Sequence, residues 1–310
     1  MFYVIYAECK IYNMAEFEQD RNTISNPSKI SFSGWKKIAI IIKDKIDENN
    51  LSIVSAGVAF YAFLAIFPAI MALVSIYGLA VNPEQIEYQL NQLASMVPEE
   101  AFGIVEKRLE AFISTSGKTL GWGMAIGILF SIWSANKGMK SLFTGIDISY
   151  ATRSTRGFIK QNALTLLFTF AAIILVILSM GLIVVFPAVV GELGLPQNIE
   201  NLISWLRWPI LALIVGFFLC IIYKYAPARN NPKLKWVVPG ALVATILWLI
   251  ASWGFSYYVS NFGSYGEVYG SIAAVVIMML WLFISCFTVL LGAQLNSASE
   301  RYAKKVTAFE

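Results

Sequence analysis

From Trp236 to Ser299 the chain carries a single charged residue, Glu267. A helix needs about 20 mainly apolar residues to cross the roughly 30 Å hydrocarbon core of a membrane, so this stretch is long enough for two spans. Glycines surround Glu267, and we interpret 261–269 as a tight hairpin on the outer side. The sequence therefore predicts two antiparallel spans, at about 236–260 and 269–298.

Four further apolar runs precede this pair, at about 52–80, 119–136, 162–190 and 202–223. The chain has 310 residues, of which 58% are hydrophobic and 14% are charged. A water-soluble fold of this length cannot bury so much apolar surface. We therefore predict an all-α polytopic membrane protein with six transmembrane helices, the first of which is kinked at Pro68.

The charges outside these runs predict the orientation. Nineteen of the 23 Lys and Arg residues lie before the first span, between the second and third, between the fourth and fifth, or after the sixth. Cytoplasmic loops of membrane proteins carry such an excess of basic residues. Both termini are therefore expected to face the cytoplasm.

Around a membrane domain at 34–302, we expect a flexible cytoplasmic lead at 1–33 and a short cytoplasmic tail at 303–310. Met14 is a second candidate for the start of the chain. Isoleucines and lysines alternate at helical spacing over 34–48, which predicts an amphipathic basic helix. This helix either lies on the inner leaflet or forms an elbow that anchors the first span.

The segment 82–118, between the first two spans, is predicted to form two amphipathic helices outside the membrane, because its apolar residues recur at three- and four-residue steps. Six acidic residues against three basic ones make this outer cap acidic. It either covers the mouth of a cavity or packs on the outer surface.

Several classes of chemistry lack their usual residues. The chain has no histidine, so it offers no Ser–His or Cys–His nucleophile pair and no histidine-based metal site. The three cysteines are far apart, no carboxylate lies within a predicted span, and no phosphate-binding P-loop motif occurs. We therefore predict a protein that is not an enzyme and that uses no cofactor or metal.

The remaining candidates are mostly neutral polar and aromatic residues near the span ends, together with the proline of the first span. Polar groups that face lipid are costly, so we expect these side chains to point inward, either along a substrate path or toward other helices as hydrogen-bond partners. Lys137 either extends to the membrane surface or holds an anionic headgroup, and Glu267 and Tyr269 are candidates for an outer gate. The predicted substrate path comprises Tyr61, Pro68, Trp133, Asn136, Lys137, Asn162, Glu267, Tyr269, Gln294 and Asn296.

Several ordered motifs resemble those of the YihY/BrkB family of bacterial inner-membrane proteins. They cover 55–68, 133–138, 223–227, 239–240, 269–274, 280–281 and 292–296. The resemblance extends over roughly 34–302. It implies six α-helical spans in the bacterial inner membrane and a role in moving lipids or other amphiphiles across it.

The leading hypothesis is thus a carrier or flippase-like protein whose partners are membrane lipids. The alternative is a non-catalytic scaffold or accessory subunit that binds an envelope protein or a second copy of itself. Members of the family have also carried the label ribonuclease BN. Metal-dependent cleavage of RNA needs clustered His and Asp ligands, and this chain has no histidine and no acidic cluster at one depth. The topology alone requires a basic inner face, so we expect no nucleic-acid partner.

Overall fold

The computed structural model describes residues 26–80, 117–152, 156–186, 190, 196–229, 233–261 and 271–307, and every structural statement below concerns these residues. All regular elements in these ranges are helical, with no strand among them. The elements are η1 (Pro27–Lys29), α2 (Phe32–Glu48), α3 (Leu51–Ala80), α6 (Gly117–Tyr150), α7 (Phe158–Met180), the π-helical turn η2 (Gly181–Val185), α9 (Gln197–Tyr225), η3 (Leu234–Trp236), α10 (Val238–Asn261) and α12 (Ser271–Thr307). The prediction of an all-α fold is confirmed for the described residues.

The first two long helices meet at a sharp elbow. The hydroxyl of Ser31 accepts a hydrogen bond from the N–H of Gly34 and so caps the start of α2. At the other end, Asn50 has a φ of 49°, a left-handed conformation that asparagine tolerates better than most residues. As a result, α2 and the first part of α3 (Leu51–Ile66) enclose a bend of 64°.

Helix α6 ends in a hydrogen-bonded turn. Ala151 has a φ of 46°, the N–H of Ala151 bonds the carbonyl of Ile148, and the N–H of Thr152 bonds the carbonyl of Asp147. This is the Schellman arrangement, in which glycine is the usual left-handed residue. The helix therefore continues to Tyr150, well beyond the predicted end of the second span at 136.

Four helices are long and apolar enough to cross a membrane. They are Phe158–Ile183, Asn198–Tyr225, Leu234–Val259 and Ala273–Ala303, and a fifth span exists if α2 and the start of α3 are counted together. These four coincide with the predicted third to sixth spans. The predicted first and second spans lie within α3 and α6, whereas the count of six spans stays a prediction. The outer cap lies outside the described residues, apart from 117–118 at the start of α6, and so does most of the hairpin.

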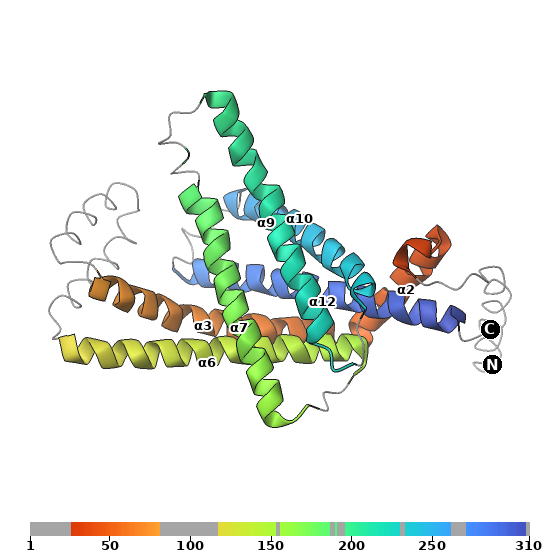
Figure 1. Ribbon diagram of the computed structural model, residues 1–310, viewed down its shortest axis with the longest axis horizontal. Helices are drawn as coiled ribbons and strands as arrows, with labels where there is room; N and C mark the ends of the chain where they lie inside the picture. Colours follow the sequence, from red (N-terminus) through yellow and green to blue (C-terminus); the bar gives the residue numbers. More distant parts are fainter. Residues whose placement is uncertain are drawn as a thin grey trace. The chain divides into compact units, whose positions relative to one another are not determined.

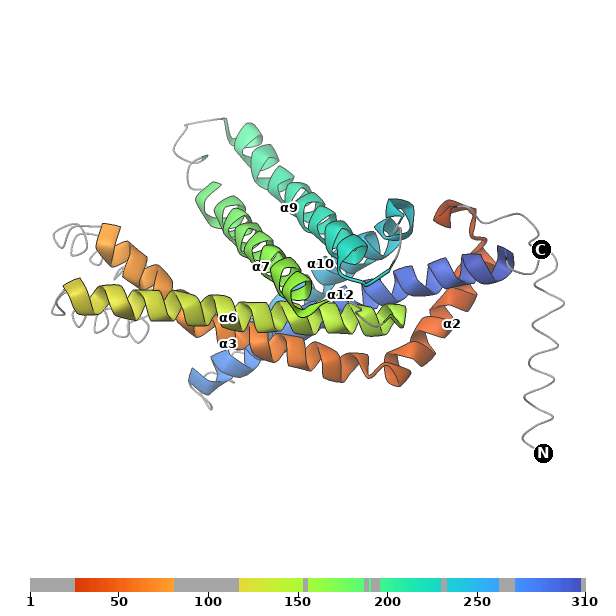
Figure 2. The ribbon, with the colours of Figure 1, turned by 60° about the horizontal axis from the view of Figure 1, so that its bottom comes forward.

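The chain divides into two compact units, Phe60–Gly138 on the one hand and the residues before and after this segment on the other. In the larger unit α10 packs along α12, and α9 contacts both α10 and α7. Figures 1 and 2 show α7 and α9 side by side. The main core of this unit combines the start of α3 and the end of α6 with residues from α7, α9, α10 and α12, and Tyr223, Phe143 and Leu290 are fully buried in it.

A second, smaller core joins α2 to α12. Ile38 is completely buried there, together with Ala298 and Tyr302, and Trp35 and Ile42 pack against the same cluster. Part of the apolar side of α2 thus contacts protein, whereas Ile41 is 39% exposed, and the elbow that anchors the first span stays a prediction. A position of α2 on the inner leaflet stays a prediction.

Candidate functional site

Asn296 on α12 caps the first turn of α10. Its Oδ1 accepts a hydrogen bond from the N–H of Gly240 at 2.7 Å, and its Nδ2 donates one to the carbonyl of Val237 at 3.0 Å. The first N–H groups of a helix have no partner within the helix, so a side chain from another helix has taken the role of the cap. Both ends of the Asn296 amide are bonded and the side chain is fully buried. These contacts agree with the alternative in which Asn296 points toward another helix as a hydrogen-bond partner.

The same crossing depends on two glycines. A Cβ atom on Gly240 would lie 2.1 Å from the carbonyl oxygen of Gly292, and a Cβ on Gly292 would lie 2.6 Å from the carbonyl oxygen of Gly240. Only glycine permits an approach this close. Two of the sequence motifs, 239–240 and 292–296, are therefore the two sides of one helix crossing.

Gln294 holds the elbow between α2 and α3. Its Oε1 accepts a hydrogen bond from Nδ2 of Asn49 at 2.9 Å, and the Gln294 side chain is buried. Asn162 makes a local contact instead, because its Nδ2 donates to the carbonyl of Phe158, one turn earlier in α7, at 2.8 Å. The structure thus gives protein partners to Asn162, Gln294 and Asn296, the predicted path residues of the larger unit that it describes.

In the smaller unit, the predicted residues of α6 form a different environment. The ammonium of Lys137 lies 5.5 Å from the centroid of the Trp133 ring, a cation–π contact. Trp133 is half exposed and continues a stripe of exposed apolar residues along α6, namely Ile126, Leu129 and Phe130. An apolar stripe that ends in a cation therefore runs along one side of this helix.

Asn136 is buried, and its Oδ1 has no hydrogen-bond partner. A buried acceptor without a hydrogen-bond partner is energetically costly. Asn136 is therefore the strongest candidate for contact with a ligand among the predicted path residues. Tyr61 lies on α3, where its carbonyl accepts a hydrogen bond of 3.5 Å from the hydroxyl of Ser134, and its ring meets that of Phe60 edge to face.

For three predicted residues the structure describes no side-chain environment, and a role in a substrate path stays a prediction for all ten. Pro68 lies within α3, which is helical from Leu51 to Ala80, and the kink at this position stays a prediction. Glu267 and Tyr269 lie outside the described residues, so the outer gate also stays a prediction.

A polar cluster surrounds Arg229 and is not predicted from the sequence. Its guanidinium pairs with Glu300 on α12, stacks over the ring of Tyr150 at 4.3 Å, and donates to the carbonyl of Tyr223 at 3.3 Å. In the sequence, Arg229 contributes only to the predicted orientation, and nothing in the spacing of Tyr150, Arg229 and Glu300 connects residues so far apart in the chain.

Two further residues of this region hold the end of α9. Arg156 donates to the carbonyls of Tyr225, at 2.9 Å, and Ala226, also at 2.9 Å, which have no partner in the last turn of the helix. Oδ1 of Asp147 accepts hydrogen bonds from the hydroxyl of Thr152 and from the N–H of Ala228. The ends of α6 and α9 are thereby joined by charged side chains.

Tyr150 and Arg229 keep unused hydrogen-bonding atoms within this cluster. The hydroxyl of Tyr150 and Nε of Arg229 are buried without a partner. Burial raises the pKa of the Tyr150 hydroxyl well above its usual value, and the nearby positive charge of Arg229 opposes that rise only in part. The phenol of Tyr150 therefore stays protonated at neutral pH. The ion pair and the stacking contact of Arg229 are the contacts through which this cluster can stabilise the fold.

Comparison with known proteins identifies the family. Residues 42–309 match the model of a family described as Virulence factor BrkB. The chain belongs to the BrkB family. The resemblance to the YihY/BrkB family is thus confirmed, and with it the assignment of the chain as a membrane protein.

Two full-length relatives of this BrkB chain show the same similarity. The Bacillus subtilis protein named "Putative ribonuclease-like protein YfkH" is 28% identical over 255 residues, which are 81% of this chain and 90% of that protein. A UPF0761 membrane protein of Aggregatibacter aphrophilus is 26% identical over 271 residues, 84% of this chain and 91% of that protein.

A UPF0761 membrane protein of Xanthomonas campestris pv. campestris is 38% identical over 103 residues, which cover 32% of this BrkB chain and 24% of that protein. The match to this relative thus spans about a quarter of its length. No solved structure matches the chain.

Proposed function

We propose that this BrkB-family protein is a carrier that moves lipids or other amphiphiles across the bacterial inner membrane. The observation that supports the proposal most directly is the stripe on α6. Exposed apolar side chains at Ile126, Leu129 and Phe130 lead to Trp133, and the Trp133 ring lies 5.5 Å from the Lys137 ammonium. A bound amphiphile has the same two parts in the same order, an apolar chain and a polar head.

In this proposal Lys137 attracts an anionic headgroup, and the apolar side chains of the stripe contact the acyl chains. The buried amide of Asn136 adds an acceptor with an unused lone pair, which suits a hydroxyl or ammonium group of the ligand. The proposal involves no chemical step, so the protein is proposed to act without enzyme activity, cofactor or nucleic acid.

The proposed topology has six spans, with α3 and α6 providing the first two and with both termini in the cytoplasm. The distribution of Lys and Arg residues supports this orientation. Fusion of a reporter that is active only outside the cytoplasm provides the test. We expect no signal from a fusion at the C-terminus and a strong signal from one placed between 262 and 270, and the reverse pattern would exclude the topology.

Transport is tested with the purified full chain in liposomes that contain a fluorescent phospholipid. We expect the wild-type protein to move the label between leaflets, and we expect Lys137→Ala and Trp133→Ala to slow it. Lys160→Ala is the control, because it removes the same charge from a different helix, α7. If the wild-type protein moves no labelled lipid, the carrier proposal is wrong.

A non-catalytic scaffold is the second candidate. The bonding of both ends of the Asn296 amide and of Oε1 of Gln294 in contacts between helices favours a rigid body in this part of the larger unit. A stoichiometric envelope protein, or a second copy of the chain, that co-purifies with the wild-type protein while liposomes show no transport would support the scaffold over the carrier.

A further inference from the structure

Arg207 is an isolated cation inside an apolar helix. The apolar segment Asn198–Tyr225 of α9 is long enough to cross a membrane, and Arg207 is the only charged residue between Glu200 and Lys224. At 1.5 Å per residue, Arg207 lies about 7–8 Å along the helix from Leu202, the predicted start of the span. A charge at such a depth is costly, and charged residues in spans usually bind a partner or a substrate.

The structure shows no acidic partner for this cation among the described residues. Nε of Arg207 is buried without a hydrogen-bond partner, and the guanidinium carbon lies 5.4 Å from the centroid of the Trp208 ring. Glu200 is on the same side of α9 but two turns away, which is about 10 Å along the axis. The positive charge of Arg207 is therefore not neutralised by any described side chain.

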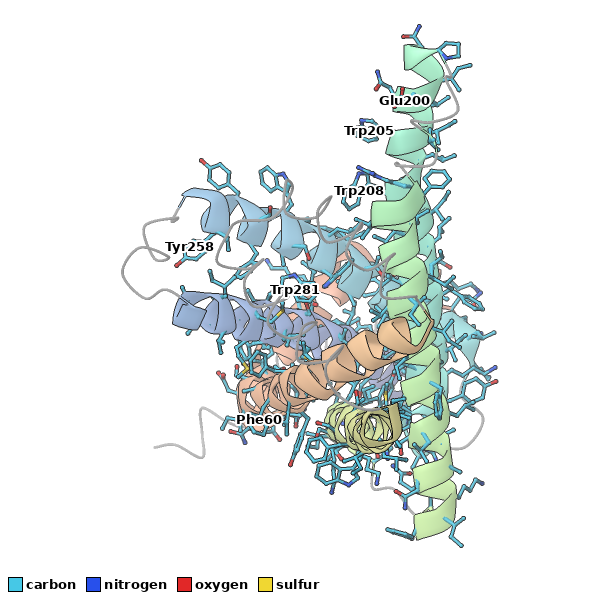
Figure 3. All side chains as sticks on the ribbon, turned by 90° about the vertical axis from the view of Figure 1, so that its left-hand side faces the viewer. Phe60, Glu200, Trp205, Trp208, Tyr258 and Trp281 are labelled. Atoms are coloured by element: carbon cyan, nitrogen blue, oxygen red, sulfur yellow. The ribbon has the colours of Figure 1, made fainter. Side chains whose placement is uncertain are left out.

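Two neighbouring features favour a phospholipid headgroup. Trp205 and Trp208 are exposed and point to the same side of α9 (Figure 3), and tryptophan indoles favour the headgroup level of a membrane. Pro209 lies inside the helix and has no N–H to donate to the carbonyl of Trp205. One turn of α9 thus carries a guanidinium donor and a carbonyl acceptor with an unused lone pair.

We propose that Arg207 binds the phosphate diester of an anionic phospholipid whose headgroup carries a hydroxyl. The guanidinium donates two hydrogen bonds to the phosphate oxygens, the headgroup hydroxyl donates to the carbonyl of Trp205, and the two indoles contact the glycerol region. This site is on α9, apart from the Lys137 stripe. It depends on α9 lying in a membrane but does not depend on transport.

The competing explanation is that Arg207 only extends to the membrane surface. A lysine performs that task equally well, because it needs only a long chain and a charge. A site that grips a phosphate through two parallel hydrogen bonds does not accept lysine in the same way. The variant Arg207→Lys therefore separates the two explanations.

The test measures lipid binding to the purified full chain by native mass spectrometry. The probes are phosphatidylglycerol and phosphatidylcholine of equal chain length. We expect wild type to prefer phosphatidylglycerol, Arg207→Gln to lose the preference, and Arg207→Lys to weaken phosphatidylglycerol binding about tenfold, because lysine cannot make the two parallel hydrogen bonds to the phosphate. Lys224→Gln is the matched control, since it removes another cation beside an aromatic ring from the same helix, and it should leave the preference unchanged.

Equal binding by wild type and Arg207→Gln would overturn the proposal, as would full phosphatidylglycerol binding by Arg207→Lys. Displacement of the lipid by millimolar inorganic phosphate would assign the site to free phosphate and also overturn it. If Arg207→Gln does not fold, the binding of phosphatidylglycerol by Arg207→Lys alone distinguishes a phosphate site from an arginine that only extends to the membrane surface. The two proposals can fail separately. If the lipid preference depends on Arg207 but no labelled lipid moves in liposomes, this site is supported and only the carrier proposal is rejected.

Discussion

The side-chain amide of Asn296 bonds the backbone N–H of Gly240 at 2.7 Å, so one turn of α12 provides the cap for the first turn of α10. The two residues are 56 positions apart in the chain. Their contact sets the register of α10 along α12, because a shift of either helix by one residue would remove the cap. Polar residues near the ends of spans can therefore have a structural task that their position in the sequence does not reveal.

The contribution of the Asn296 cap to stability can be tested by mutation. Asn296→Ala leaves the N–H of Gly240 buried without a partner, whereas the carbonyl of Val237 keeps its bond from the N–H of Ala241, and one such unpaired group costs about 1–3 kcal/mol. We expect a clear drop in the thermal unfolding midpoint in detergent. Asn296→Asp keeps the acceptor and should lose less. An Asn296→Ala variant as stable as wild type would contradict this role.

The close helix crossing at Gly240 predicts that the effect of a Gly→Ala substitution on folding depends strongly on its position along α10. Gly240→Ala places a methyl group 2.1 Å from the carbonyl oxygen of Gly292, so the helices must separate, and we expect little folded protein by size-exclusion chromatography. Gly254→Ala on the same helix meets nothing within 4 Å. This control should be as stable as wild type or up to about 1 kcal/mol more stable, since alanine favours helix. Equal folding of both variants would exclude the close crossing.

A double-mutant cycle measures the bond between Asn49 and Gln294. Hydrogen bonds between helices in membranes average about 0.6 kcal/mol, with a maximum near 1.7 kcal/mol. We expect Asn49→Ala and Gln294→Ala together to cost less than the sum of the single variants, by an amount in this range. Strictly additive unfolding free energies would show that the bond does not hold the elbow.

Two ion pairs of the structure should differ in how much they contribute to the free energy of unfolding. The side chains of Arg229 and Glu300 are 11% and 20% exposed, whereas those of Lys45 and Glu48 are 33% and 63% exposed. Exposed pairs contribute at most about 1 kcal/mol, while removing one partner of a buried pair costs several. Glu300→Gln should therefore lower the unfolding free energy much more than Glu48→Gln. Similar losses in both variants would argue against a structural role for the Arg229 cluster.

Tyr150→Phe tests the buried hydroxyl that has no partner. At neutral pH we expect equal or higher stability than wild type, because the variant removes a buried polar group without a hydrogen bond and keeps a ring beneath Arg229. Burial raises the pKa of this hydroxyl in the folded state, so above about pH 10 the unfolded chain loses the proton first and wild-type stability falls as pH rises. Unfolding midpoints between pH 8 and 11 should show a smaller decline for Tyr150→Phe, and parallel curves would contradict the assignment.

Much of the fold could be predicted without coordinates. A helix that crosses lipid must satisfy its own backbone hydrogen bonds and present apolar side chains along its whole length, so a span is visible in a single continuous segment. For this reason the third to sixth predicted spans coincide with α7, α9, α10 and α12. Helix ends were predicted less well. The end of α6 at Tyr150 depends on the left-handed conformation of Ala151, and α12 continues to Thr307 although its last turns are polar.

The candidate site was only partly predictable. The polarity of Asn136, Gln294 and Asn296 marked them for attention, but the choice between a ligand and a neighbouring helix depends on what lies opposite each side chain. Gln294 and Asn296 meet Asn49, Gly240 and Val237, whereas Oδ1 of Asn136 meets no partner.

Membrane location, helical structure and membership of a family recognised by motifs along most of the chain all follow from the amino-acid sequence. Hydrophobicity and local backbone preference are properties of each segment, so they act before any segment meets another. The packing of the helices sets which polar groups bond to each other inside the protein and which have no internal partner. Hydrogen bonds and ion pairs act over about 3–4 Å, and the residues that they join, such as Arg229 and Glu300, become neighbours only when the helices pack.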